Sequence, residues 1–126
     1  MVDNLGSPLE ADAFIKKCLE NIDFKLLNFF LPYASFPPAL QRICEAMLIL
    51  LEEEYEFSVY KAKKLLAANP KELQERMQQF NPKTLNEKQI NALDIIIKEL
   101  EDQDLQTISK GGAQLYAWIT AIYSAR

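Results

Sequence analysis

Few side chains in this 126-residue sequence could do chemistry, and their spacing does not favour a catalytic site. The sequence has no histidine, so the usual base that activates a nucleophile is missing. Its two cysteines, Cys18 and Cys44, lie 26 residues apart, whereas a structural zinc site needs about four Cys or His ligands. Ser109 and Lys110 are adjacent, and adjacent residues on a helix do not face each other. These patterns argue against hydrolysis, group transfer and structural zinc.

The remaining polar residues do not form a recognisable cofactor site either. The sequence contains no glycine-rich loop with the spacing that cradles nucleotide phosphates. Four glutamates, at positions 52, 53, 54 and 56, lack the spaced oxygen ligands and the glycine turn of a calcium loop, and they indicate a solvated helix end. We therefore expect a protein that is not an enzyme and that uses no cofactor and no metal, which leaves binding or scaffolding.

Composition limits the class of partner. Apolar residues make up 49% of the chain, which fits one compact domain. The net charge of −4 argues against a general nucleic-acid binder, and the longest apolar run, residues 46–51, is far too short to span a bilayer. Because no signal peptide precedes them, we interpret Cys18 and Cys44 as reduced core thiols of a cytoplasmic protein, with a disulfide as the alternative.

Helix-start signals divide the chain, and apolar residues recur behind them at spacings of three and four. The predicted starts are Ser7-Pro8, Asp23, Pro37-Pro38, Ser58, Asn69-Pro70, Thr84 (a capping box with Glu87) and Asp104. The predicted stripes include Phe14 in the first helix and Ile108 in the last, and the helix after Pro38 should be the most buried. No segment alternates with period two. We predict an all-α, compact bundle of six to seven helices forming one domain over residues 8–126, after a flexible stretch at residues 1–7.

A glycine pair interrupts the last predicted helix. Gly111 and Gly112 would lie in its second or third turn, where each costs about 0.5–1 kcal/mol relative to alanine. We interpret the pair as a place where a neighbouring helix backbone comes close, with a local kink as the alternative.

Three stretches of the sequence match the motifs of one protein family in the same order. They are FPPALQRICEAMLILL at residues 36–51, YKAKKLL at 60–66 and ISKGGAQLYAWITAIY at 108–123. Together they resemble the microtubule-binding domain at the stalk tip of dynein heavy chains. That family has a Pro-Pro pair before a helix with Glu-Ala, an aromatic residue followed by Ala-Lys-Lys-Leu-Leu, and Ser-x-Ala-Ala ahead of a tryptophan. Gly111 and Gly112 stand at the Ala-Ala pair and Trp118 at the tryptophan. The resemblance covers roughly residues 20–126.

The resemblance implies a small helical bundle at the end of an antiparallel coiled coil, so we expect the first and last helices to form an antiparallel, stalk-like pair. It also implies docking on tubulin through basic residues. The positions that match are Lys25, Lys61, Lys63, Lys64 and Lys110. Each of them could equally be a solvated lysine without a partner.

The chain also departs from the family pattern. Asn28 and Thr120 stand where basic residues are frequent in the family, and the glutamates at 52–56 would repel the acidic tubulin surface. We therefore expect either weak binding to microtubules or loss of tubulin binding.

Two functions follow as hypotheses. The first is a microtubule-binding module of, or related to, a dynein heavy chain, acting in the cytoplasm on the cytoskeleton, including the cilium or axoneme. The second is a helical adaptor in a ciliary or cytoskeletal assembly that binds another cytoskeletal protein. Its contacts would be exposed aromatic side chains, since such residues dominate protein interfaces. The candidates are Phe29, Tyr33, Phe57 and Tyr116.

Overall fold

A computed structural model of the chain describes residues 8–26, 37–67 and 69–126, and within them every regular element is helical. The α-helices are α1 (Pro8–Glu20), α2 (Pro38–Glu52), α3 (Val59–Ala67), α4 (Pro70–Gln79), α5 (Glu87–Leu100), α6 (Leu105–Ile108) and α7 (Lys110–Ser124). Short 3₁₀ turns lie at residues 24–26 and at η3 (Pro82–Thr84). The prediction of an all-α bundle is confirmed for this part of the chain. The stretch predicted to be flexible, residues 1–7, lies outside the described residues.

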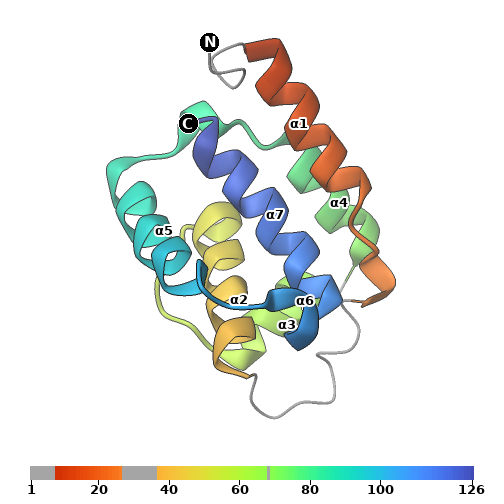
Figure 1. Cartoon of the computed structure of the whole chain (residues 1–126), viewed down its shortest axis with the longest axis vertical. Helices are drawn as coiled ribbons and strands as arrows, with labels where there is room; N and C mark the ends of the chain where they lie inside the picture. The colour runs from red at the N-terminus through yellow and green to blue at the C-terminus, as the bar shows by residue number, and fades with distance from the viewer. Residues whose placement is uncertain (1–7, 27–36, 68) are drawn as a thin grey trace.

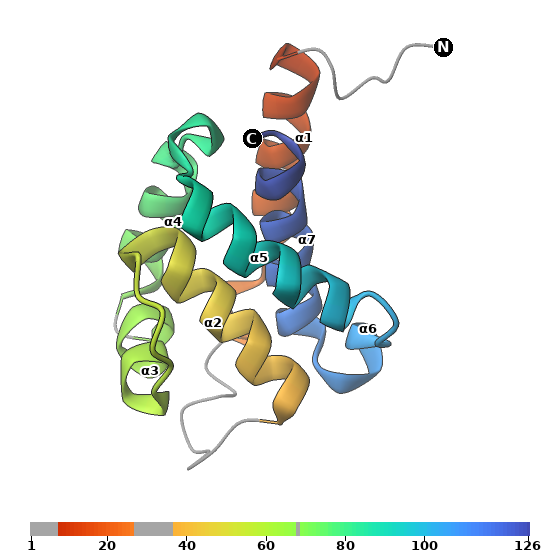
Figure 2. The same cartoon turned by 90° about the vertical axis from the view of Figure 1, so that its left-hand side faces the viewer.

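α7 lies in the middle of the bundle, with α1 on one side and α5 on the other (Figure 1). α1 and α7 pack side by side and run in opposite directions, so the start of α1 and the end of α7 lie at the same end of the molecule (Figure 1, Figure 2). This confirms the expected antiparallel pairing of the first and last helices. α2 packs against both α5 and α7, α3 packs against α2, and α4 packs against α3 and α1.

α2 contributes more buried residues than any other described helix, as its apolar spacing predicts. Nine of its fifteen residues are buried. Pro38 begins the helix, where a proline loses no helical hydrogen bond. The helix ends in a left-handed residue, Glu53, whose φ is 49° and whose N–H donates to the Leu48 carbonyl. A left-handed conformation is common just after a helix, but it normally favours glycine.

Two predicted helix caps are confirmed. The Ser58 hydroxyl accepts a hydrogen bond from the Lys61 N–H at 3.0 Å at the start of α3. The Asn69 side chain accepts one from the Glu72 N–H at 3.1 Å at the start of α4. Each satisfies a backbone donor that has no partner inside its helix.

The predicted capping box at Thr84 and Glu87 is wrong by two residues. Asn86 caps α5, and the box is reciprocal with Gln89: each side chain accepts from the other's backbone N–H, at 2.8 and 3.0 Å. The Thr84 hydroxyl instead donates to the Asn81 carbonyl at 2.7 Å, because residues 82–84 form the η3 turn. A Thr that closes one turn cannot open the next helix.

The last predicted helix is in fact two helices. Asp104 caps only the short α6, where its side chain accepts from the Thr107 N–H. Ser109 then adopts extended backbone angles and caps α7, accepting from the Gly112 N–H at 3.0 Å. Ile108, predicted to face inward, ends α6 and is 42% exposed. The glycine pair therefore lies in the first turn of α7, not in a second or third turn.

The interpretation of the glycine pair as a place where a neighbouring helix backbone comes close is confirmed only in part: backbone comes close at Gly111 alone, and it belongs to the 3₁₀ turn at residues 24–26. A Cβ atom on Gly111 would lie 3.0 Å from the Cβ of Leu26 and 3.5 Å from its carbonyl carbon and oxygen. A Cβ atom on Gly112 would lie 3.0 Å from a methyl carbon of Leu40 in α2. Thus Gly111 accommodates the turn at residues 24–26, and Gly112 accommodates the Leu40 side chain of α2.

Three further predictions concern the first helix and the segment after it. Phe14 was predicted to face inward but is exposed, because it lies to one side of the face that Ala11, Cys18 and Leu19 bury. Cys18 and Cys44 are buried and not disulfide-bonded, as predicted. The helix predicted to begin at Asp23 is a single 3₁₀ turn as far as Leu26, and its continuation lies outside the described residues.

Candidate partner-binding surface

Three of the five candidate lysines lie on α3. Ala62, Leu65 and Leu66 turn inward and hold this short helix on the bundle. The same helical period leaves Lys64 exposed and Lys61 and Lys63 half-buried, so the three ammonium groups extend from one short helix.

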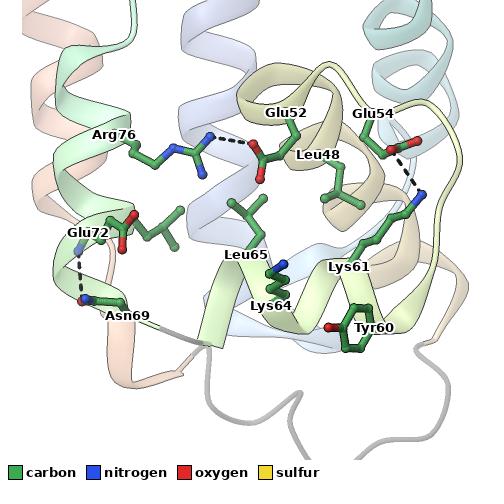
Figure 3. A pocket seen from close by; sticks show the side chains of 11 residues that line it. Leu48, Glu52, Glu54, Tyr60, Lys61, Lys64, Leu65, Asn69, Glu72 and Arg76 are labelled. Atoms are coloured by element: carbon green, nitrogen blue, oxygen red, sulfur yellow. Dashed lines mark hydrogen bonds and ion pairs between the residues drawn. The ribbon is translucent and has the colours of Figure 1, made fainter.

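Lys61 is not a free charge. Its ammonium lies 3.2 Å from a carboxylate oxygen of Glu54, in the loop between α2 and α3 (Figure 3). The other oxygen of Glu54 accepts a hydrogen bond from the Glu56 N–H at 3.0 Å. That backbone bond first, and Lys61 second, lower the pKa of Glu54 below its ordinary value. Glu54 therefore stays ionised and neutralises Lys61.

A cleft of about 500 Å³ separates α3 from α4, and we call it the α3–α4 cleft (Figure 3). Its lining includes apolar, basic and acidic side chains from three helices and the loop after α2. They are Leu48, Glu52, Glu54, Tyr60, Lys61, Lys64, Leu65, Asn69, Glu72, Leu73 and Arg76. Two of the candidate lysines, Lys61 and Lys64, thus border a hollow rather than a flat face.

Arg76 lies at the rim of this cleft. Its Nη2 donates to the Leu51 carbonyl at 2.7 Å and lies 2.9 Å from a carboxylate oxygen of Glu52. The first bond satisfies a carbonyl near the end of α2 that has no partner within the helix. Arg76 therefore joins α4 to the end of α2. The sequence offered no signal for this role, because the two residues that it contacts lie 24 and 25 positions earlier.

Lys25 and Lys110 lie at a different place in the bundle. Because Leu26 packs on Gly111, the turn that carries Lys25 rests on the first turn of α7, which carries Lys110. The Asp23 N–H also donates to the Gln114 side chain at 2.8 Å, which fixes this turn to α7. Both lysines are exposed, and neither has an acidic partner among the described residues. The fold thus brings these two positions together and keeps the α3 lysines on another element.

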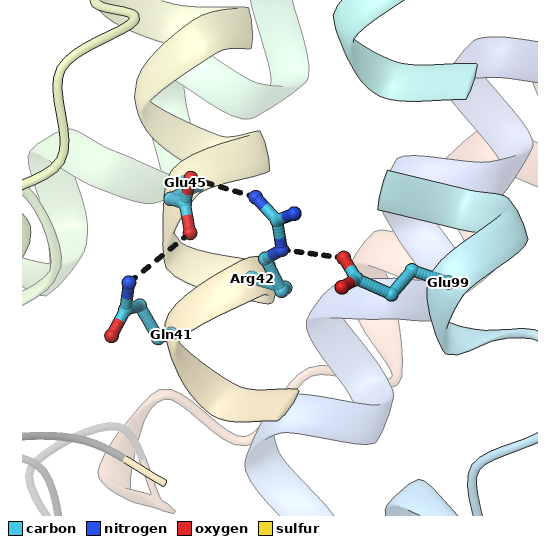
Figure 4. Close-up of polar contacts among 4 residues, drawn as sticks. All are labelled: Gln41, Arg42, Glu45 and Glu99. Atoms are coloured by element: carbon cyan, nitrogen blue, oxygen red, sulfur yellow. Dashed lines mark hydrogen bonds and ion pairs between the residues drawn. The ribbon is translucent and has the colours of Figure 1, made fainter. Parts of the chain in front are cut away.

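A second polar cluster joins α2 to α5 (Figure 4). The Arg42 guanidinium lies 3.1 Å from a Glu45 oxygen and 2.5 Å from a Glu99 oxygen, and Gln41 donates to Glu45 at 3.4 Å. These contacts raise the pKa of Arg42, mainly through the hydrogen bond to Glu99. Each charge in the cluster is compensated, so we assign it a structural role.

Of the aromatic residues proposed for an adaptor, Phe57 and Tyr116 are half-buried and pack against the core. The Tyr116 hydroxyl donates to the Ile97 carbonyl at 3.3 Å. Phe29 and Tyr33 lie outside the described residues. The aromatic side chain that the sequence reasoning missed is Tyr60, which is 74% exposed at the rim of the α3–α4 cleft. Its spacing of four residues from Lys64 was the available signal.

We also searched the described residues for a metal site and for a membrane-spanning helix. No group of three or more His, Cys, Asp or Glu side chains in the described ranges is placed to hold a metal ion. Among the helices described above, none combines the length and apolarity that crossing a membrane requires. The chain matches no protein-family model, no curated protein and no solved structure.

Proposed function

We propose that this domain is a non-catalytic protein-binding module that docks on the microtubule lattice through lysines, and that it acts on the cytoskeleton in the cytoplasm. Support comes from the collinear resemblance to the dynein stalk-tip domain at residues 36–51, 60–66 and 108–123. The observation that carries the proposal is that four of the five positions matching the family, Lys25, Lys63, Lys64 and Lys110, have no acidic partner among the described residues. Tubulin is acidic, so unpaired ammonium groups would steer and hold it.

The structure changes one part of this proposal. Lys61 already holds Glu54, so we assign it a smaller share of the binding than Lys63 and Lys64. Exposed ion pairs are worth about 0–1 kcal/mol each and weaken with salt. We therefore propose weak docking that several lysines share.

Co-sedimentation with microtubules at low and raised ionic strength tests the proposal. Replacing Lys61, Lys63 and Lys64 with alanine should weaken pelleting about fivefold, because Lys63 and Lys64 each lose a pair of about 0.5 kcal/mol and Lys61 contributes less. The matched control replaces Lys16, Lys71 and Lys83, which are exposed and remove the same charge from other elements. Absence of pelleting at low salt would exclude the proposed function, and equal loss in both triple variants would exclude the assigned surface.

A second candidate function is an adaptor that binds a different cytoskeletal protein. The observation that favours it is the exposure of Tyr60, since tyrosine is enriched among residues that dominate interfaces. Binding of this kind should persist at raised salt and should be lost when Tyr60 is replaced with alanine.

A further inference from the structure

The α3–α4 cleft has one unpaired charge on each wall. Around its rim, Lys61 is paired with Glu54 and Arg76 with Glu52. Lys64, on the α3 wall, and Glu72, on the α4 wall, have no side-chain partner within the described part of the chain (Figure 3). An occupant would therefore meet a positive charge on one side and a negative charge on the other.

The floor between these walls is apolar. Leu48, Leu65 and Leu73 line it, and each is buried in the bundle. The cleft volume of about 500 Å³ lies within the range typical of ligand pockets. Tyr60 extends the apolar surface outward at the rim. The cleft has room for a large apolar side chain between the two charged walls.

We propose that the α3–α4 cleft binds a short extended segment of a partner protein, in which one large apolar residue stands between an acidic and a basic residue. In an extended chain, the neighbours of an inward-pointing residue leave the backbone on the side away from the floor, so only long charged side chains can turn back to the two walls at the rim. The apolar side chain would contact the leucine floor, while its neighbours stay at the rim. There the acidic residue pairs with Lys64 and the basic residue with Glu72. A segment with two acidic residues would bring one of them against Glu72.

This inference rests on the proposed function only in taking the chain as a protein-binding module. It assigns the cleft a partner chemistry that differs from the acidic lattice proposed for the lysines. The two can therefore fail separately.

The experiment uses the full chain, isotope-labelled for amide NMR, and end-blocked peptides with Gly-Ser flanks. The probe has Lys-Leu-Glu at its centre, and the comparison peptides have Lys-Ala-Glu and Glu-Leu-Glu. The probe should shift the amide signals of residues that line the cleft, with a Kd on the order of 1 mM, because so small a contact must offset the cost of association. Replacing its leucine with alanine should weaken binding about tenfold. The Glu-Leu-Glu peptide should bind about threefold more weakly than the probe.

A charge reversal provides the sharper test. Glu72→Lys should invert the preference, so that Glu-Leu-Glu binds more tightly than Lys-Leu-Glu. Glu75→Lys is the matched control, because Glu75 is exposed on the same helix and does not line the cleft. Lys64→Ala should weaken binding of the probe about threefold.

The proposal is overturned if the probe shifts no signals at about 10 mM, a concentration well above the expected Kd. It is equally overturned if the shifts lie away from the cleft, or if Glu75→Lys inverts the preference as Glu72→Lys does. Peptide binding without microtubule pelleting would support peptide binding in the α3–α4 cleft and reject the proposed docking on microtubules. Pelleting without peptide binding would do the reverse.

Discussion

Replacing Gly111 with alanine tests how α7 packs on the turn at residues 24–26. Alanine is favoured over glycine within a helix by about 0.5–1 kcal/mol, whereas overpacking a close contact costs about 1–3 kcal/mol. The new methyl group would lie 3.0 Å from the Leu26 Cβ and 3.5 Å from Leu26 backbone atoms. No rotamer change moves any of these atoms, so the turn itself must shift. We expect a net loss of about 1 kcal/mol in the free energy of unfolding.

Urea unfolding followed by circular dichroism measures this loss, and for a domain of this size thermal unfolding should show a fall of about 3–5 °C. Measuring Gly111→Ala in two variants of Leu26 tests whether the Leu26 Cβ atom causes the loss. Leu26→Ala retains the Cβ atom, so the penalty of Gly111→Ala should persist in it. Leu26→Gly removes that atom, so only the helix preference for alanine remains and Gly111→Ala should stabilise this background by about 0.5–1 kcal/mol. Equal penalties in the two backgrounds, or a Gly111→Ala protein more stable than the parent, would refute the reasoning.

Three further predictions concern single side chains. Burial raises the pKa of Cys44 to about 12, so a thiol reagent at pH 8 should label Cys44 only as fast as the bundle opens. Labelling of Cys44 should be slower than labelling of the less buried Cys18, with each rate measured in the variant whose other cysteine is replaced with serine. Labelling of Cys44 faster than that of Cys18 would contradict this prediction. Glu53→Gly should raise the free energy of unfolding by about 0.5–1 kcal/mol, because glycine adopts the left-handed conformation at this position without strain. Urea titration measures this free energy, and an unchanged or lower value would contradict the prediction. Hydrogen bonds from Lys98, and then from Tyr123, lower the pKa of Asp94, so ionised Asp94 stabilises the fold above the ordinary pKa of 3.8 and this contribution is lost as pH falls through the lowered pKa. Asp94→Asn should therefore have a lower free energy of unfolding than the parent at neutral pH. A difference in the free energy of unfolding that does not narrow in acid would contradict this linkage.

Local signals made much of the fold predictable from the sequence. The Ser58 and Asn69 caps and the start of α2 at Pro38 depend on neighbouring residues, and each lies where its pattern indicates. The prediction at Thr84 failed because a competing turn, η3, uses the same hydroxyl. The split at Ser109 was missed because the apolar stripe continues across two helices that differ in direction.

The candidate site was less predictable for a different reason. Lysines can be found in a sequence, but their partners come from other elements. The pairing of Lys61 with Glu54 depends on the path of the loop after α2, and that of Arg76 with Glu52 on how α4 packs beside α2. The α3–α4 cleft exists only once three helices have assembled. Periodicity within one segment carries no information about such assembly.

Arg76 gives the cleft a thermodynamic link to the rest of the bundle. The same guanidinium lines the cleft and holds the Leu51 carbonyl, so a bound carboxylate that drew it away would leave the last turn of α2 free to fray. The coupling must be reciprocal, because loosening that turn would alter the affinity of the cleft by the same factor. Amide exchange at residues 51–54 would then report occupancy of the cleft through the opening of the last turn of α2.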